Sequence, residues 1–408
     1  MPEFLTLDDV ALKGKVVLVR VDFNSPVDPN TKKLLDDTRI RAHGKNTIKE
    51  LIQKGAKVVI LAHQGRPGEP DFISLKQHAE RLSEVLGRPV EYVDDLYGET
   101  AQNAIKGLKN GEVIVLKNTR TYPEERKSKT PEEHAQSEFI KSLAPLADLF
   151  VNDAFSAAHR AHASVVGFSA VLPSVAGRIM ERELKALSRV LEKPEKPCVF
   201  ILGGAKADDS LEISRYVLKN GIADYVLTGG ITGHLFLVAT GVDLGKPNME
   251  FLEKQKVLDL VPGIQELMKT YPGKVKTPVD VAVEVEGKRQ EVSVGSLPTE
   301  HPIFDIGTET IKEYGEVIKA AKSIVVSGPP GVYEKEEFLK GTKGLLEAVA
   351  ESDGFSLVGG GHTVAAVHEL GLADKMSYIS TAGGALIEFL MGKTLPAVAA
   401  LEAAAKKK

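Results

Sequence analysis

Residues 16–24 read VVLVRVDFN and residues 200–206 read FILGGAK, and these two stretches together decide the fold. Each begins with a run of apolar, largely β-branched residues, which is typical of a buried strand. The first stretch ends in charged and polar side chains, whereas the second ends in glycines. In an open parallel sheet the carboxyl ends of the strands meet at one edge, where ligands bind. We therefore expect one part of the chain to hold an anion with side chains and another part to hold a second anion with backbone amides.

The same contrast recurs along the chain. Further apolar runs of the first half end in basic and polar residues, in VVILAHQGR (58–66), VIVLKNTR (113–120) and LFVNDAFSAAHR (149–160). Runs of the second half end in glycines, in IVVSGPPG (324–331) and SLVGGGH (356–362). Stretches of helical period separate the runs, which is the pattern of repeated βαβ units. The sequence predicts an α/β fold with two Rossmann-like parallel-sheet lobes.

Length and composition set the frame for this prediction. A chain of 408 residues exceeds what a single core usually supports, so two domains are expected. The formal net charge of -4 argues against a nucleic-acid or membrane partner, because such partners need a basic surface. The single cysteine, Cys198, cannot form an internal disulfide, and no secretory signal follows Met1, so we expect a cytoplasmic protein. Residues 225–242 lack Asp, Glu, Lys and Arg, but their glycines and His234 favour a buried strand and helix over a membrane span.

The domain boundary is predicted near residues 178–197. There RIMERELKALSRVLEKPEKP reads as a charged amphipathic helix that Pro194 and Pro197 stop, and we expect it to act as a hinge. The predicted parts are a first domain over 1–175, an interdomain helix over 176–196 and a second domain over 197–385. Alternation with period two around Glu286 and Gly287 predicts a hairpin appended to the second domain.

Basic residues dominate the strand ends of the first half. They are Arg39, Arg41, His63, Arg66, Arg120, His159, Arg160 and His162. Taken singly, each is more often a solvated surface charge than a ligand contact, but four strand ends share the pattern. Arginine suits bidentate capture of carboxylate and phosphate, so we expect a small, multiply anionic substrate. The alternative is a metal site of His63, His159 and His162; we disfavour it because adjacent arginines would repel a cation.

Glycine-rich turns mark the second half. Gly203 and Gly204 precede Lys206 and a predicted helix, an arrangement that lets backbone N–H groups approach a phosphate. One such turn is weak evidence, because glycine often serves packing alone. Three more follow in GPPGVYEK (328–335), LVGGGHT (357–363) and STAGGA (380–385). Their number favours a nucleotide polyphosphate as the second ligand.

These residues resemble the phosphoglycerate kinase family, in its archaeal branch, over nearly the whole chain. The resemblance rests on RVDFN, HQGRP, NDAFSAAHRAH, LGGAK, GPPGVYE and STAGG in the family's order. It implies a glycolytic and gluconeogenic kinase that transfers a phosphoryl group reversibly from 1,3-bisphosphoglycerate to ADP, giving 3-phosphoglycerate and ATP, directly in line after domain closure. It also implies Mg²⁺ with the nucleotide, a possible homodimer, and a C-terminal segment, 386–408, that packs back on the first domain.

The resemblance assigns the site residues. The first domain would bind the phosphoacid through Asp22, Phe23, Asn24, Arg39, His63, Gln64, Gly65, Arg66, Arg120 and Arg160. The second would bind the nucleotide through Lys206, Gly328, Glu334, Gly359, Gly360, Gly361, His362 and Thr363. The catalytic groups would be Arg39, Lys206, Gly383 and Gly384.

Three positions depart from the commonest family pattern. Ser210 stands in place of a second lysine, His362 in place of an aspartate and Ser327 in place of an asparagine. The metal ligands therefore stay unassigned, and we expect Mg²⁺ to be held mainly by nucleotide phosphates and water. Two alternatives remain open, a kinase of another small phosphorylated acid and a catalytically inactive ligand-binding relative.

Overall fold

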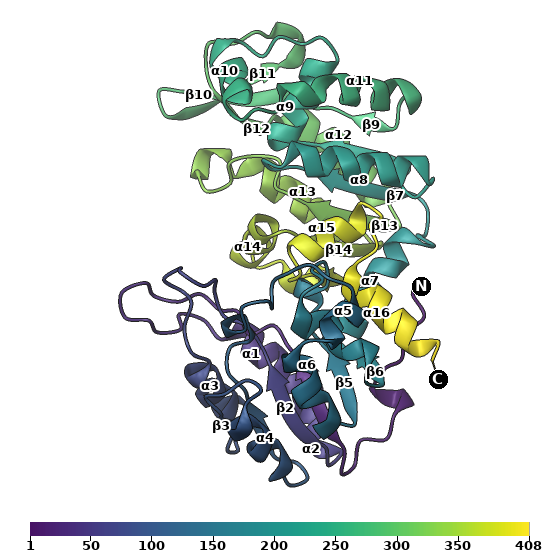
Figure 1. Ribbon diagram of the computed structural model, residues 1–408. Helices are drawn as coiled ribbons and strands as arrows, with labels where there is room; N and C mark the ends of the chain where they lie inside the picture. The colour runs from purple at the N-terminus through teal and green to yellow at the C-terminus, as the bar shows by residue number, and fades with distance from the viewer. Residues whose placement is uncertain (408) are drawn as a thin grey trace. The chain divides into compact units, whose positions relative to one another are not determined.

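The structure, a computed structural model, describes residues 1–407 and divides into two compact units. The first comprises Met1–Lys185 together with the chain from Thr394 onward, and the second comprises Ala186–Lys393. Each unit contains a six-stranded sheet in which every recorded strand pair is parallel, with helices packed against it (Figure 1). The predicted fold class is confirmed.

The sheet of the first unit has the strand order β3-β4-β2-β1-β5-β6. Its strands are β1 (Val16–Arg20), β2 (Lys57–Leu61), β3 (Glu91–Tyr92), β4 (Val113–Val115), β5 (Leu149–Asn152) and β6 (Ser174–Ala176). Val17 and Val19 enter one hydrophobic core and Leu18 enters another, so β1 is buried on both faces. Burial on both faces explains why this strand reads as a continuous apolar run.

Short helices connect these strands. They are α1 (Thr38–His43), α2 (Lys49–Gln53), α3 (Lys76–Leu86), α4 (Glu99–Lys106), α5 (Pro131–Ala135) and α6 (Glu138–Leu143). A π-helical turn, Gly44–Ile48, joins α1 directly to α2. Gly44 faces α3 closely there, because a Cβ atom at this position would lie 3.0 Å from Leu82 Cδ1. The connection brings Arg39 and His43 of α1 to the carboxyl edge of the sheet.

The sheet of the second unit has the order β15-β14-β13-β7-β8-β9. Its strands are β7 (Cys198–Leu202), β8 (Tyr225–Thr228), β9 (Val275–Lys276), β13 (Ser323–Ser327), β14 (Phe355–Gly359) and β15 (Tyr378–Ile379). Its helices are α8 (Ala207–Lys219), α9 (Gly230–Ala239), α10 (Lys246–Lys254), α11 (Val261–Thr270), α12 (Thr308–Ala320), α13 (Lys340–Glu351), α14 (Gly361–Glu369) and α15 (Gly384–Leu390). The apolar stretch 225–242 forms β8 and α9, and no helix in residues 1–407 is long and apolar enough to cross a membrane.

A small antiparallel sheet, β11-β10-β12, is added to the second unit. It consists of β10 (Asp280–Val285), β11 (Lys288–Ser293) and β12 (Ile303–Ile306). The turn between β10 and β11 has positive φ at Glu286 (49°) and Gly287 (76°), as a type I′ hairpin requires. The predicted hairpin is therefore present, and β12 joins it from a short run that the sequence pattern did not reveal.

Helix α7 (Arg178–Leu191) contains the boundary between the units and ends before Pro194. The last helix, α16 (Pro396–Ala405), belongs to the first unit, where the Ala397 N–H donates to the Ala158 carbonyl oxygen at 3.0 Å. Residues 386–393 lie in the second unit because α15 continues through residue 386 without a break. The C-terminal return thus begins at Thr394, eight residues after the predicted position.

Candidate active site

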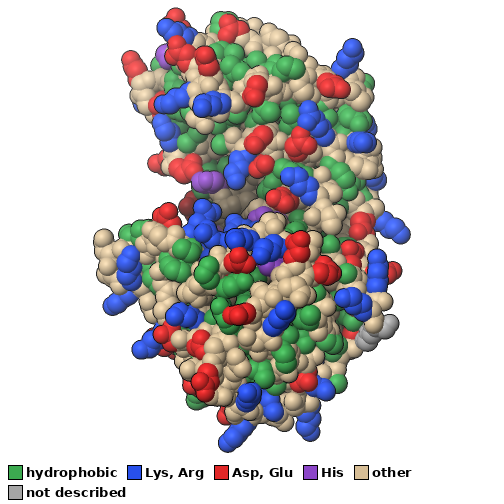
Figure 2. All heavy atoms as spheres, in the orientation of Figure 1, with side chains coloured by type: hydrophobic (Ala, Val, Ile, Leu, Met, Phe, Trp, Pro, Cys, Tyr) green, Lys and Arg blue, Asp and Glu red, His purple; other side chains and the backbone are tan. Residues whose placement is uncertain are grey.

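The basic strand ends of the first unit come together in a pocket of about 520 Å³. Of the predicted substrate-binding residues, it is lined by Asn24, His63, Gly65, Arg66, Arg120 and Arg160. They follow four different strands, β1, β2, β4 and β5, whose carboxyl ends meet at one sheet edge. Figure 2 shows Lys and Arg side chains gathered on this part of the unit.

Asp22 and Arg39 lie beside this pocket and pair with each other. Arg39 Nη1 donates to Asp22 Oδ2 at 2.7 Å, and the Ser156 hydroxyl donates to the same oxygen. The Asn24 N–H donates to Asp22 Oδ1 at 3.0 Å. Burial alone would raise the pKa of Asp22, but the charge of Arg39 and the hydrogen bond from Ser156 lower it to about 2. Asp22 is therefore ionised, while 42% of the Arg39 side chain stays exposed for a ligand.

Phe23 and Gln64, also predicted to bind substrate, have no exposed surface. Phe23 belongs to the hydrophobic core of the unit. The Gln64 amide accepts from the Ser25 N–H at 2.9 Å and donates to the Ser25 and Asp71 carbonyl oxygens. Both side chains thus hold the loops that carry Asp22, Asn24 and Gly65.

Arg20 is a residue of this site that the sequence analysis did not assign. Its side chain is buried, and its guanidinium donates to Ser164 Oγ at 2.8 Å, to the Val21 carbonyl oxygen at 2.6 Å and to His63 Nδ1 at 3.0 Å. Because Nδ1 accepts from a guanidinium, the His63 ring carries its proton on Nε2. Burial and the Arg20 charge hold the pKa of His63 well below its usual range, so the ring is neutral.

Glu125 continues this chain of contacts. Its Oε1 accepts from the Ser164 N–H at 3.0 Å and from Ser164 Oγ at 2.8 Å, which links Arg20, Ser164 and Glu125. Burial raises the pKa of Glu125 to about 7, against the lowering effect of Arg20. Nothing in the sequence indicated that Glu125 is buried, because it stands among the charged residues 124–127. The burial of Arg20 could have been inferred, because it lies inside the apolar run of residues 16–21.

The site has an excess of positive charge. Burial and the neighbouring charges of Arg20 and Arg160 lower the pKa of Arg120 to about 10. Burial and the same surroundings lower the pKa of His162 to about 3. Nowhere in residues 1–407 do three or more His, Cys, Asp or Glu side chains form a group that could hold a metal ion. The arrangement therefore favours an anion and disfavours the histidine metal site.

The glycine-rich turns of the second unit line a second pocket, of about 490 Å³. Of the predicted residues it contains Lys206, Gly328, Gly360, Gly361, His362, Thr363, Gly383 and Gly384. Gly203 and Gly204 of the predicted phosphate-binding turn also line it, and so do residues not assigned to the site from the sequence, among them Asp209, Glu388 and Lys393. Gly359 and Glu334 are outside this lining; Gly359 ends β14. Helices α8 and α14 begin at the pocket, so their N-terminal amides face it.

Two of the turns pack against each other through their backbones. The Gly203 N–H donates to the Ser327 carbonyl oxygen at 3.0 Å, and the Gly204 N–H donates to that of Pro329 at 2.8 Å. A Cβ atom on Gly203 would lie 2.5 Å from the Pro329 carbonyl oxygen, and Gly328 has a φ of 92°. Only glycine fits this contact, which brings the two turns together at the pocket wall and uses the Gly203 and Gly204 N–H groups in doing so.

The departures from the family pattern have defined places. Ser210 lines the pocket although it is only 5% exposed, and its hydroxyl accepts from Thr232 Oγ at 3.2 Å. Thr363 Oγ accepts from the Gly328 N–H at 2.8 Å. The His362 side chain is 78% exposed, and its Nδ1 lies 3.7 Å from Glu334 Oε1. Lys393 is a second lysine on the pocket wall besides Lys206.

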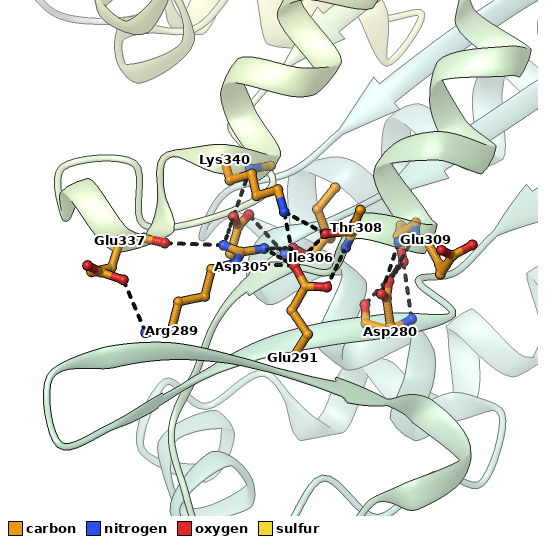
Figure 3. A network of polar contacts seen from close by, with 11 residues as sticks. Asp280, Arg289, Glu291, Asp305, Ile306, Thr308, Glu309, Glu337 and Lys340 are labelled. Atoms are coloured by element: carbon orange, nitrogen blue, oxygen red, sulfur yellow. Dashed lines mark hydrogen bonds and ion pairs between the residues drawn. The ribbon is translucent and has the colours of Figure 1, made fainter.

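A polar network centred on the largely buried side chains of Arg289 and Asp305 (Figure 3) lies next to the loop of residues 331–334, which carries Glu334. Asp305 of β12 accepts from Arg289 Nη1 and from the Gly341 N–H, both at 2.7 Å. The Val332 N–H donates to the Phe304 carbonyl oxygen at 2.7 Å, and a Cβ atom on Gly331 would lie 2.3 Å from Asp305 Oδ1. The loop is therefore seated directly on β12, and burial raises the pKa of Asp305 to about 6.

Comparison with known proteins decides the family. The family profile described as "Phosphoglycerate kinase" matches residues 7–393. The chain belongs to the phosphoglycerate kinase family. It is 50% identical over 400 residues to the phosphoglycerate kinase of Methanothermobacter thermautotrophicus, covering 98% of this chain and 97% of the relative. It is also 50% identical over 412 residues to that of Methanococcus maripaludis, covering 99% of each.

Solved structures agree with this assignment. The crystal structure of phosphoglycerate kinase from Pyrococcus horikoshii OT3 has a TM-score of 0.89 at 41% identity, covering 99% of this chain and 100% of that chain. The enzyme from Coxiella burnetii has a TM-score of 0.85 at 36% identity, covering 98% and 99%. The prediction of a kinase of this family is confirmed, and the match to archaeal relatives extends over nearly the whole chain.

Proposed function

We propose that the chain transfers the acyl phosphate of 1,3-bisphosphoglycerate to ADP, reversibly, giving 3-phosphoglycerate and ATP. The observation that carries the proposal is the pocket of the first unit, where Arg66, Arg120 and Arg160 converge. Burial and, after it, the charges of Arg20 and Arg160 lower the pKa of Arg120, so positive charge is concentrated around this pocket. A compact anion with a phosphate and a carboxylate compensates that charge and accepts bidentate bonds from the guanidinium groups.

The pocket of the second unit supports the nucleotide assignment. Lys206 and the amides at the start of α8 and α14 suit the phosphates of ADP and ATP. Gly360 and Gly361 line the same pocket and have no side chain between their backbone and the ligand. We assign Glu334 to the ribose, because its loop is firmly seated on β12 beside His362.

The reaction needs no general base. The bond from phosphorus to the C1 carboxylate oxygen breaks while a β-phosphate oxygen of ADP bonds to phosphorus, and the carboxylate leaves as an anion. Such a transfer depends on in-line placement and on stabilisation of the equatorial oxygens. We assign these tasks to Arg39 from the acid side and to Lys206 with the amides of Gly383 and Gly384 from the nucleotide side. Since these groups belong to different units, the proposal requires the units to close during each turnover.

Magnesium would accompany the nucleotide. The carboxylates lining the nucleotide pocket are Asp209 and Glu388, and they do not form a dedicated metal cage. This donor set fits an ion that keeps its phosphate and water ligands, as Mg²⁺ commonly does. When bound, the ion would neutralise phosphate charge, and Asp209 and Glu388 would be the side chains that hold its water ligands.

A coupled assay with 3-phosphoglycerate, ATP and Mg²⁺ tests the proposal. We expect turnover that is selective for this acid over other small phosphorylated acids. Faster turnover of another phosphoacid would redirect the substrate assignment. Binding of both ligands without turnover would indicate an inactive relative.

A further inference from the structure

His43, at the end of α1, is 4% exposed and does not line the acid pocket. Both of its ring nitrogens nevertheless have polar partners. Nδ1 lies 2.6 Å from Asp153 Oδ2, and Nε2 lies 3.2 Å from the backbone nitrogen of Asp22. The ring thus bridges the loop after β1 and the loop after β5.

The partners fix the proton on this ring. The backbone N–H of Asp22 can only donate, so Nε2 must accept and carries no proton. The remaining proton sits on Nδ1 and is donated to the Asp153 carboxylate. Phe23 packs edge-on against the ring, with centroids 6.1 Å apart and planes at 64°, which keeps the ring from turning. His43 therefore presents an acceptor of fixed direction to Asp22.

Asp153 gives the bridge a rigid base. Its side chain has no exposed surface, and Oδ1 accepts from the Ile179 N–H in the first turn of α7 at 2.9 Å. Gly177 packs so closely that a Cβ atom there would lie 2.2 Å from Asp153 Oδ1. The Asp153 carboxylate is therefore held in place on two sides and restrains the position of the His43 ring.

The other end of the bridge is Asp22, which lies beside the phosphoacid pocket of the first unit. Asp22 directs Arg39 through one carboxylate oxygen and holds the Asn24 N–H with the other. Arg39 and His43 stand four residues apart on α1, so they share one helix face. A shift of the Asp22 backbone would move Arg39 away from the place where it must meet the phosphoryl group.

We propose that His43 is a positioning residue that holds the Asp22–Arg39 pair in its substrate-ready geometry through the Asp153–His43–Asp22 bridge. This inference rests on the proposed function, because its test measures turnover of 3-phosphoglycerate. It is specific to the acid side, because no described contact of the bridge reaches the lining of the nucleotide pocket. Its effect should appear with the phosphoacid and not with the nucleotide.

Two substitutions separate positioning from general stability. In His43→Asn the amide nitrogen replaces Nδ1 and still donates to Asp153, but the side chain is too short to reach the Asp22 N–H. In His43→Gln the amide oxygen replaces Nε2 and still accepts from Asp22. We expect kcat/KM for 3-phosphoglycerate to fall about tenfold in His43→Asn, the size of one lost hydrogen bond, with KM for ATP unchanged. His43→Gln should recover most of that loss.

Asn248→Ala is the matched control. Asn248 is buried in the second unit, where its amide bonds the Leu244 and His301 carbonyl oxygens and the Ile303 N–H. This variant should lower the melting temperature without changing KM for the acid.

The proposal is overturned if His43→Asn keeps wild-type kcat/KM for the acid, or if the Asn and Gln variants lose activity equally. A wild-type protein that fails to turn over 3-phosphoglycerate would instead defeat the proposed function, and calorimetric binding of that acid to the same variants would still test the bridge.

Discussion

Replacing Glu125 by glutamine removes a titrating carboxyl group from the buried chain of Arg20, Ser164 and Glu125. Burial raises the pKa of Glu125 from its ordinary value of 4.5 to about 7. Between these two values the folded protein keeps a proton that the unfolded chain has released. The free energy of unfolding contributed by this group therefore falls as the pH rises through this window, and it is constant above it.

The size of the effect follows from the two pKa values. A difference of one pH unit corresponds to about 1.4 kcal/mol, so the move from 4.5 to about 7 corresponds to about 3 kcal/mol. Glutamine cannot titrate. The free energy of unfolding of Glu125→Gln, relative to wild type, should therefore rise by about 3 kcal/mol between about pH 4.5 and about pH 7.5. Altered hydrogen bonding in Glu125→Gln can add a pH-independent change to the free energy of unfolding, but it does not alter how the difference from wild type varies with pH.

Urea unfolding followed by circular dichroism measures the difference, because the chain contains no tryptophan for fluorescence. Glu80→Gln, an exposed position on α3, serves as the matched control for loss of a carboxylate. A difference between Glu125→Gln and wild type that stays constant over this pH range would refute the reasoning. It would mean that the Glu125 carboxyl titrates alike in the folded and unfolded chain.

Two further substitutions test the reacting groups and their support. Arg39→Ala should lower kcat by about three orders of magnitude in a protein that still folds, as expected for an arginine that stabilises transferring phosphoryl oxygens. A near-normal kcat in the coupled assay would remove Arg39 from that role. Gly331→Ala places a Cβ atom 2.3 Å from Asp305 Oδ1 and should displace the loop of Glu334, raising KM for ATP about tenfold while KM for 3-phosphoglycerate stays the same. An unchanged KM for ATP in that variant would show that this loop does not contribute to nucleotide binding.

The sequence pattern predicted the sheets and much of both pockets. It did so because parallel strands deliver their carboxyl ends to one edge, so the residue types that follow each strand identify the wall of the site. His63, Arg120 and Arg160 meet in one pocket for this reason. Lys206 and Gly383 meet in the other for the same reason.

The internal pairs could not be predicted in this way. Arg20 and Ser164 are separated by 144 positions, and His43 and Asp153 by 110. Their contacts depend on how loops pack behind the sheet edge, which no local periodicity encodes. Motif membership also does not distinguish residues that can touch a ligand from those that hold the loop, as the buried Phe23 and Gln64 show.

Calorimetric titration of Arg66→Ala and Lys206→Ala with each ligand tests most directly which unit binds which ligand. The central claim is that the first unit binds the acid and the second binds the nucleotide. Arg66→Ala should weaken 3-phosphoglycerate binding at least about tenfold and leave ADP binding with Mg²⁺ unchanged, and Lys206→Ala should do the reverse. Equal weakening of both ligands by either variant, or unchanged acid binding in Arg66→Ala, would contradict the assignment of the two sites.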